Sequence, residues 1–595
     1  MSPTMRWIKL LDGSEKPSRQ LIGGKAHSIA HIQSLGLRVP PAFVVTTEAH
    51  AAYLTTGAFP HGLLQELADG IAWLERLTRR SFGTGPQPLL VSVRSGAAIS
   101  MPGMMDTVLN VGITDQTELA LATESGDTAF ARDTHRRFAQ LYGNVVLKAD
   151  VDGFDNGKGA DHWREEIRKA TGSELPNDAN GQLLGAVGAV FESWNSRRAK
   201  RYRQHQGISD LLGTAVTVQA MVFGNLDARS GTGVLFSRNP STGDAEPFGE
   251  YLRRAQGEDV VSGAFTPEPL SAMSDAAPAA YAELLAAART LEHAEKEVQD
   301  IEFTVERGEL FLLQTRNAKL APQAAVRTAI SMAREGLIDI KTAICRIPPD
   351  RIRQLMAPRI APEARAAAVQ LAGGEGACPG VGIGIVVTDA DEAERLSDQG
   401  VAVVLARRTT SPHDLHGMIS STAVVTEEGG STSHAAVVSR ALGKPCIVGC
   451  GVDSLHALAG QTVTVDGQSG QIFLGSLAVL IPDEQSDGDL AQLTAWAEPL
   501  SPIRVIRAKD APSEDILDLV ELPGSEDAAN LSSILAQHRS SKGAVGGAIA
   551  SDEGVRVAIE AGLEFIVADP ILPSLLAAVQ NASVEKSVSD HDVAR

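Results

Sequence analysis

The sequence predicts a multidomain protein that combines α/β and α+β units. Three observations support this prediction. The chain has 595 residues, too many for one hydrophobic core, because a domain usually takes roughly 100–200 residues. Aromatic residues make up only 4% of the chain, whereas glycine occurs 56 times and small aliphatic residues are plentiful. Helical and strand-like patterns alternate along most of its length, as expected for aliphatic strands packed against alanine-rich helices.

Charge and cysteine content narrow the function classes. The net charge of −20 argues against nucleic-acid or anionic-membrane partners, because both attract basic surfaces. Four cysteines are too few for a disulfide framework, and Cys446 and Cys450 are interpreted as core thiols. The N-terminus has no signal-peptide pattern, and no apolar run approaches the ~18 residues of a membrane span. We therefore expect a cytoplasmic protein that binds neither nucleic acid nor membrane.

The first predicted unit covers residues 1–325. Residues 24–35 predict a helix because their apolar residues recur at helical spacing. Short apolar runs predict strands at residues 89–93, 214–222 and 233–236. Residues 299–316 predict a β-hairpin closed by an Arg-Gly turn. This unit is expected to alternate helices with strands.

Three further units are predicted along the chain. Residues 326–372 are rich in Ala, Arg and Ile and predict a helical connector. Residues 373–481 begin with a glycine-rich entry into a strand and close with a strand pair, which predicts a second α/β domain. Residues 482–595 predict a polar linker followed by a short α/β region, with a β-α-β pattern at 543–570.

The most informative segment surrounds His434. A short apolar strand leads into Gly429 and Gly430, which allow a sharp turn, and the hydroxyl residues Ser431 to Ser433 are typical helix caps. The helix is predicted to begin at His434. A neutral imidazole there is a competent nucleophile, and a phosphoryl group on it would lie at the helix N-terminus, among free N–H donors. From local sequence alone, a capped turn with a hydrogen-bonded histidine remains an equal alternative.

The N-terminal unit contains two candidate phosphate-site segments. A predicted strand delivers Arg94 into a Gly/Ser/Met loop whose N–H groups could wrap phosphates. Lys25 opens the first helix after two glycines. Strand alternation places Asp300 and Glu302 on one face of the hairpin, an arrangement that suits Mg²⁺ bridging phosphates. Taken singly, these patterns favour simpler interpretations: a loop-to-helix turn with a surface lysine at Lys25, and two acids on a solvated strand face at Asp300 and Glu302.

The resemblance to a known family adds specificity. The segment around His434 reads GGSTSHAAVVSRALGKPCIVGCG and resembles the phosphohistidine domain of the phosphoenolpyruvate-utilising enzymes, most closely that of the pyruvate phosphate dikinase family. The first unit resembles the ATP-grasp nucleotide-binding domain of that family nearly end to end. Six segments occur in the family's order: GGKAHSIAHIQSLGLRVPPAFVVTT, SVRSGAAISMPGMMDTVLNVG, VTVQAMVFGN, SGTGVLFSRNPSTGD, GEYLRRAQGEDVVSG and DIEFTVERGELFLLQTR.

The resemblance implies site residues, cofactors and a reaction. His434 falls on the phosphorylated position of a swivelling domain, and Arg94 joins it among the implied catalytic residues. The implied ATP- and phosphate-site residues are Lys25, Arg94, Arg137, Gln219, Val222, Asp300, Glu302 and Gln314. The last three are also the implied metal ligands. The implied supporting loop consists of Gly429, Gly430, Thr432 and Ser433. ATP is then the substrate, Mg²⁺ the metal and inorganic phosphate the co-substrate.

Two departures from the family pattern lie beside the histidine loop. Glu428 stands where the dikinases carry an arginine before the glycine pair, and Thr409 stands where they carry a glutamate. Glu428 brings negative charge towards an anionic phosphoryl group, so the docking partner of this loop is the feature that the departures affect.

The family also has a TIM barrel that binds pyruvate or phosphoenolpyruvate. A barrel takes about 250 residues, and roughly 105 follow the predicted linker here, too few for eight strands. The leading hypothesis is therefore a dikinase-type phosphotransferase in which ATP phosphorylates His434. The acceptor site then lies on another polypeptide, such as a separate barrel subunit that binds pyruvate or phosphoenolpyruvate, or in the C-terminal tail. The oligomeric state stays open.

Two alternatives remain open. The chain could transfer the phosphoryl group to a different small molecule, or it could be an ATP-sensing regulatory protein with a vestigial histidine. Retention of Lys25, Arg94, Asp300, Glu302 and His434 together argues against the second alternative.

Overall fold

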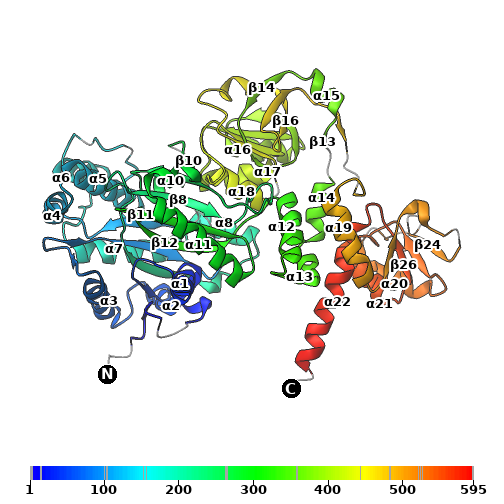
Figure 1. Ribbon diagram of the computed structural model, residues 1–595, viewed down its shortest axis with the longest axis horizontal. Helices are drawn as coiled ribbons and strands as arrows, with labels where there is room; N and C mark the ends of the chain where they lie inside the picture. Colours follow the sequence, from blue (N-terminus) through cyan, green and yellow to red (C-terminus); the bar gives the residue numbers. More distant parts are fainter. Residues whose placement is uncertain are drawn as a thin grey trace.

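The structure is a computed structural model. It describes residues 5–13, 17–99, 101, 105–151, 153–155, 157–261, 265–356, 359–442, 444–480, 484–512, 514–519, 522, 524–525 and 527–592. Within these ranges, no helix combines the length and the apolar character needed to cross a lipid bilayer. Figure 1 shows three bodies along the chain, which we call the N-terminal unit (residues 5–317), the middle unit (370–475) and the C-terminal unit (484–592).

The N-terminal unit contains two antiparallel five-stranded sheets. The first has the order β1-β2-β7-β5-β6, and the second has the order β10-β9-β8-β11-β12. The first sheet comprises β1 (Ile8–Leu10), β2 (Ala42–Val45), β7 (Ala215–Ala220), β5 (Val91–Gly96) and β6 (Thr107–Val111). The second comprises β10 (Glu268–Pro269), β9 (Phe248–Arg253), β8 (Gly231–Phe236), β11 (Gln299–Glu306) and β12 (Glu309–Asn317). The predicted α/β and α+β character is thus confirmed.

The predicted hairpin forms as β11 and β12, joined by Arg307 and Gly308, which both have positive φ. Its side chains alternate as expected. Ile301, Phe303 and Val305 are fully buried beside α1 (Arg19–Ser34) and α11 (Pro278–Glu295). The acids between them face the other side of the sheet. Burial of the apolar face therefore fixes where the acids point.

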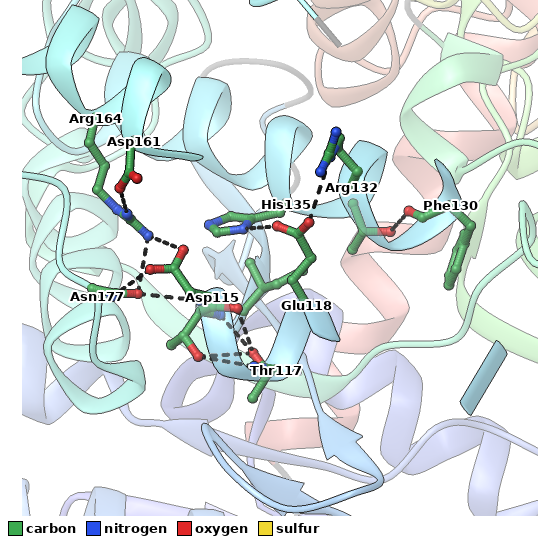
Figure 2. A network of polar contacts seen from close by, with 12 residues as sticks. Asp115, Thr117, Glu118, Phe130, Arg132, His135, Asp161, Arg164 and Asn177 are labelled. Carbon is green, nitrogen blue, oxygen red and sulfur yellow. Dashed lines mark hydrogen bonds and ion pairs between the residues drawn. The ribbon is translucent and has the colours of Figure 1, made fainter. Parts of the chain in front are cut away.

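Four helices inserted after β6 cover the first sheet: α4 (Asp115–Ser125), α5 (Thr128–Val145), α6 (Ala160–Thr171) and α7 (Ala179–Ser193). Figure 2 shows the polar network that joins the first three of these helices. His135 on α5 meets Glu118 on α4, with 2.6 Å between Nδ1 and Oε2. Arg164 on α6 contacts Asp115 at the start of α4. These contacts join α5 and α6 to α4.

The middle unit is an eight-stranded sheet with the order β14-β21-β20-β16-β17-β18-β19-β15. Its strands are β14 (Gln370–Gly373), β21 (Gln471–Leu474), β20 (Thr462–Asp466), β16 (Val381–Val387), β17 (Val403–Arg407), β18 (Ala423–Thr426), β19 (Cys446–Val448) and β15 (Glu375–Cys378). The four strands from β16 to β19 are parallel. Its helices are α16 (Ala390–Asp398), α17 (Leu415–Ser420) and α18 (His434–Leu442). The predicted helix start at His434 is confirmed.

The chain enters and leaves the middle unit through one two-stranded ribbon, in which β13 (Arg359–Ile360) pairs with β22 (Val479–Leu480). The helices α12 (Pro322–Arg334), α13 (Ile340–Cys345) and α14 (Pro349–Leu355) precede the ribbon. They share one core with the C-terminal unit and lie between it and the N-terminal unit in Figure 1. The connector helices therefore pack against the end of the chain.

The C-terminal unit has a four-stranded parallel sheet with the order β23-β26-β25-β24. Its strands are β23 (Arg504–Ile506), β26 (Phe565–Val567), β25 (Gly543–Val545) and β24 (Ile516–Asp518), and its helices are α19 (Gly488–Ala497), α20 (Ala528–Gln537), α21 (Asp552–Glu560) and α22 (Leu572–Asp592). The predicted β-α-β pattern is confirmed as β25, α21 and β26. Glu484, at the start of this unit, is buried and pairs with Arg507 at 2.6 Å.

Candidate active site between the N-terminal and middle units

The first helix breaks at Gly23, and this break positions Lys25. Gly23 has φ 75° and ψ 167°, a left-handed conformation that favours glycine. A Cβ on Gly23 would lie 1.9 Å from the carbonyl oxygen of Gly96 on β5. The amide of Gly24 donates to the carbonyl of Ala97 at 2.9 Å, so the restarted helix is fixed to the end of β5. Lys25 therefore projects close to Arg94.

Lys25, Arg94 and Glu302 form one charged group between the two sheets. Arg94 Nη2 lies 3.2 Å from Glu302 Oε2, and the Gln314 amide donates to the other oxygen of Glu302. Burial, followed by the charge of Arg94, lowers the pKa of Lys25 to about 7. Burial opposes ionisation of Glu302, but the charges of Arg94, Arg316 and Lys25 outweigh it and lower the pKa of this carboxyl. The Glu302 carboxylate is therefore surrounded by Arg94 and Arg316, and by Lys25 as a third cation when that amine is protonated.

Asp300 lies on the same face of β11 as Glu302 and is 4% exposed. Arg316, directly across the hairpin, donates to Asp300 at 2.8 Å. The described residues contain no cluster of three or more His, Cys, Asp or Glu side chains that could hold a metal ion. Two carboxylates beside an amide nevertheless fit Mg²⁺, because this ion binds through one or two carboxylates and takes its remaining ligands from phosphates and water.

Strand register extends this site across the second sheet. Glu302 on β11 pairs with Gln314 on β12 and with Val234 on β8, and Val234 pairs with Glu250 on β9. The four residues form one row on one face, because directly opposed residues in a sheet point the same way. Adjacent strands are about 4.8 Å apart, so Glu250 lies about 10 Å from Glu302 along the row.

Glu250 is where the middle unit docks. Its carboxylate accepts hydrogen bonds from Ser431 Oγ at 3.1 Å and from Thr432 Oγ1. The backbone of Gly430 also lies against it, because a Cβ on Gly430 would be 2.4 Å from Glu250 Oε1. Apolar packing extends the contact: Trp194 and Ala199 belong to the same buried cluster as Ala435. The loop before His434 therefore reaches the row that contains Glu302.

The predicted capping role fails at Ser433, the residue directly before α18. Its Oγ is buried with no hydrogen-bond partner among the described residues. The hydroxyls of Ser431 and Thr432 donate to Glu250, and these bonds to a carboxylate are charge-assisted.

One ring nitrogen of His434 is hydrogen-bonded, and the other has no partner among the described residues. Nδ1 lies 3.1 Å from Thr410 Oγ1. Nε2 is buried and has no hydrogen-bond partner among the described residues. Burial lowers the pKa of His434 to about 4, against a smaller opposing effect of Asp414. The ring is therefore neutral at physiological pH. When Nδ1–H donates to Thr410, the lone pair is on Nε2.

Comparisons with known proteins agree with this geometry. The family model "Pyruvate phosphate dikinase, AMP/ATP-binding domain" matches residues 56–282, and "PEP-utilising enzyme, mobile domain" matches residues 400–470. Pyruvate, phosphate dikinase 2 of Zea mays is 42% identical over 534 residues, which cover 84% of this chain and 60% of the maize protein. The pyruvate, phosphate dikinase of Rhizobium meliloti is 42% identical over 527 residues, covering 81% and 58%. The chain belongs to the pyruvate phosphate dikinase and phosphoenolpyruvate-utilising enzyme family.

This chain spans about three fifths of the length of these dikinase relatives. The two family models cover both sides of the docking contact, since Glu250 lies in the first matched range and Ser431 and Thr432 lie in the second. The middle unit is the family's mobile domain, and the N-terminal unit is its nucleotide-binding domain. The structure captures these two dikinase-family domains in contact.

Arg137, which the family resemblance marks as a phosphate contact, is engaged by acids. Its guanidinium lies 2.7 Å from Asp133, 2.9 Å from Glu258 and 2.7 Å from Asp259. The two last acids are on α9 (Gly257–Val261), whose Val260 packs in one apolar cluster with Val234 of the active-site row. Arg137 thus borders the same face of the sheet, but among the described residues it contacts none of Lys25, Arg94 and Glu302.

The expected adenine side lies at the chain segment after β7. The Gln219 side chain is 2% exposed and donates to the carbonyl of Pro40 at 3.1 Å. Within the described part of the chain, the amide and carbonyl of Val222 make no hydrogen bond. Thr217, missed from the sequence, lies directly opposite Arg94, and its buried hydroxyl has no partner among the described residues. Open polar groups therefore line this face of β7 and its exit.

Proposed function

We propose that the chain catalyses ATP-dependent phosphorylation of its own His434, as the first part of a pyruvate, phosphate dikinase-type reaction. One observation carries the proposal. Ser431 and Thr432 of the histidine loop are bound to Glu250, on the same sheet row as Glu302. A histidine loop held on this row supports transfer from a nucleotide bound farther along it, because docking places donor and acceptor in one assembly.

ATP is proposed to bind between the two sheets of the N-terminal unit. The base would use the open backbone groups at Val222, and the triphosphate would lie over Lys25 and Arg94. Mg²⁺ would be held by Asp300 and Glu302, with Gln314 beside them, and would neutralise phosphate charge. Phosphate binding would return a proton to Lys25, because an anion next to an ammonium favours its charged form.

The proposed step uses the unpartnered ring nitrogen of His434. The Nε2 lone pair forms a bond to the β-phosphorus of ATP, the bond from that phosphorus to the α–β bridging oxygen breaks, and AMP leaves with the electron pair. Thr410 keeps the Nδ1–H in place, and the charge of Asp414 stabilises the cationic ring. Inorganic phosphate then removes the terminal phosphoryl group as pyrophosphate, which leaves one phosphoryl group on Nε2.

The mobile domain is then proposed to carry the group away. We propose domain limits of 1–325 for the nucleotide domain, 326–372 for the connector, 373–481 for the mobile domain and 482–595 for the C-terminal region. The β13–β22 ribbon, the one two-stranded connection to the mobile domain in the described chain, supports a rigid-body rotation. The proposed acceptor is pyruvate on a separate barrel subunit, and the proposed location is the cytoplasm.

Labelling from two positions of ATP tests the proposal. We expect purified protein with Mg²⁺ and β-³²P-ATP to acquire acid-labile, alkali-stable label. Label from γ-³²P-ATP should appear without inorganic phosphate and should be released as pyrophosphate when phosphate is added. Label from the γ position alone would instead indicate simple kinase transfer.

Two histidine variants make a matched pair for this experiment. His434→Ala should abolish the label, whereas His413→Ala, in an exposed position of the neighbouring segment, should leave it unchanged. Protein that binds ATP but takes no label from either position would overturn the proposal and favour the ATP-sensing alternative. Label that reaches a compound other than pyruvate would favour the alternative acceptor.

A further inference from the structure

Phe223 fixes the position of the segment that links the two sheets of the nucleotide domain. Its ring is 6% exposed and meets the ring of Phe130 edge-on at 5.4 Å, inside the core of the first sheet. Its backbone amide donates to Glu306 Oε2 at 2.6 Å. Glu306 ends β11 on the second sheet, so one residue is fixed to both sheets at once.

The residues around Phe223 are also fixed by contacts. The amide of Met221, two residues before Phe223, donates to the carbonyl of Leu90 at 2.9 Å and is thereby bound to the first sheet. Gly224 follows in a crowded position, because a Cβ there would lie 2.3 Å from the carbonyl oxygen of Ala255. Val222 therefore lies between two residues, Met221 and Phe223, whose amides are hydrogen-bonded. Its own amide and carbonyl make no hydrogen bond among the described residues.

The hairpin turn that presents Glu306 is itself tied to this segment. The amide of Arg307 donates to Ser230 Oγ at 2.9 Å, and the amide of Gly308 donates to the carbonyl of Arg229 at 3.1 Å. The carboxylate of Glu306 lines a small cavity with Phe223, Leu226 and the ion-paired Arg80 and Glu124. Glu306 is thus a rigidly placed acceptor, outside the group that surrounds Glu302.

We propose that Glu306 is a positioning residue for the nucleotide base: by accepting the Phe223 amide, it fixes the open Val222 backbone edge that reads the adenine. This inference rests on the proposed function. An open donor and acceptor on adjacent backbone groups match the hydrogen-bonding edge of adenine, and such an edge selects a base only when it cannot rotate. Glu306 would set ATP affinity and base preference without touching ATP.

The test measures ATP binding and labelling separately. Equilibrium binding of Mg²⁺-ATP and Mg²⁺-GTP would be measured in a His434→Ala background, and the labelling rate at saturating ATP would be measured with His434 intact. We expect Glu306→Ala to raise the Kd for ATP by about tenfold or more, because it removes a charge-assisted hydrogen bond. The preference for ATP over GTP should fall, and the saturated labelling rate should change by less than about threefold.

Two further variants separate positioning from general stability. Glu306→Gln keeps an acceptor oxygen at the same reach and should restore ATP affinity to within about threefold of the parent. Glu309→Ala changes the residue directly across the hairpin, an exposed acid paired with Arg38, and should have no effect. Should Glu306→Ala fail to fold, Glu306→Asp decides, since its shorter side chain withdraws the acceptor and should bind ATP more weakly than Glu306→Gln.

The possible failures are distinguishable. If the parent protein binds no ATP, the proposed function and this inference are both overturned. If the parent binds ATP, and Glu306→Ala binds ATP and GTP as the parent does, only this inference is overturned. Equal losses in Glu306→Gln and Glu306→Ala would also overturn it, because the acceptor oxygen would then be irrelevant.

Discussion

Glu250 of the nucleotide domain accepts a hydrogen bond from Thr432 of the mobile domain, 182 residues away in the chain. Ser431 donates to the same carboxylate, and Gly430 leaves no space for a side chain beside it. One buried acid thus holds three consecutive residues of the histidine loop. This contact defines the docked arrangement, and its removal should affect transfer to His434 without affecting ATP binding.

The docking contact can be tested with a double-mutant cycle. Glu250→Ala should slow single-turnover labelling of His434 by about 10- to 100-fold, the usual range for losing hydrogen bonds to a charged group, while the Kd for ATP stays within about twofold. Gly430→Ala should also slow labelling, because its Cβ would clash with Glu250.

Non-additivity is the decisive result of this cycle. Combining Glu250→Ala with Gly430→Ala should cost less than the product of the two single effects, since Glu250→Ala removes the group with which the new methyl clashes. Independent effects of the two substitutions, measured by rapid-quench labelling, would contradict direct contact between Glu250 and the histidine loop.

The depressed pKa of His434 predicts a flat pH profile. With a pKa of about 4, the imidazole stays neutral down to pH 5.5, so single-turnover labelling at saturating ATP should hardly fall between pH 8 and pH 5.5. A histidine with the ordinary pKa of about 6.5 would be about one-tenth neutral at pH 5.5, and its rate would fall about tenfold.

The lowered pKa of His434 also makes the stability of the folded protein depend on pH. In the unfolded protein the pKa of His434 returns to its ordinary value of about 6.5, and that state binds the proton more tightly. The folded state therefore loses stability as the pH falls from about 6.5 to about 4. Titration of the His434 ring by NMR provides the check. A midpoint near 6.5 in the docked protein would contradict the burial of Nε2.

Lys25 predicts proton uptake when ATP binds. With a pKa of about 7, its amine is largely neutral at pH 8, and a bound triphosphate should favour the ammonium. Calorimetry at pH 8 in buffers of different ionisation enthalpy should show uptake of a fraction of a proton per ATP, and affinity should increase as the pH falls towards 7. Lys25→Met should abolish the uptake. Equal heats of ATP binding in all buffers for the parent protein would show that no proton is taken up and would contradict this prediction.

Replacing Asp300 on the hairpin should raise the Mg²⁺ concentration that labelling requires. Asp300→Asn should raise the Mg²⁺ concentration needed for half-maximal labelling by about tenfold, because an amide is a weaker ligand than a carboxylate. Glu309→Gln, an exposed acid on the same hairpin, is the matched control and should leave the metal dependence unchanged. An unchanged requirement in Asp300→Asn would remove this residue from the proposed metal site.

Local patterns predicted the elements that bear the site well. Alternation placed Asp300 and Glu302 on one face because Ile301 and Phe303 must be buried, and the structure has this arrangement. The glycine pair and the following helix pattern predicted that a helix begins at His434. Arg316 was missed because a regular hairpin register would set Thr315 opposite Asp300. A β-bulge between Glu302 and Phe303 shifts the pairing by one residue and brings Arg316 there instead.

Contacts between residues far apart in the chain could not be predicted from the sequence. Nothing local distinguishes Glu250 from any other acid in a strand, since its role arises only when a segment 181 residues away docks on it. For the same reason, the sequence identifies Ser431 and Thr432 as helix-capping residue types but gives no sign that their hydroxyls donate to Glu250.

The most direct test of the account is the fate of the β-phosphate of ATP in a single turnover. We expect acid-labile label on Nε2 of His434, stoichiometric with the chain. It should form at a rate independent of protein concentration, because the docked histidine and the nucleotide site belong to one molecule. Protein that binds ATP yet carries no β-derived label on His434, or label that persists in His434→Ala, would contradict it.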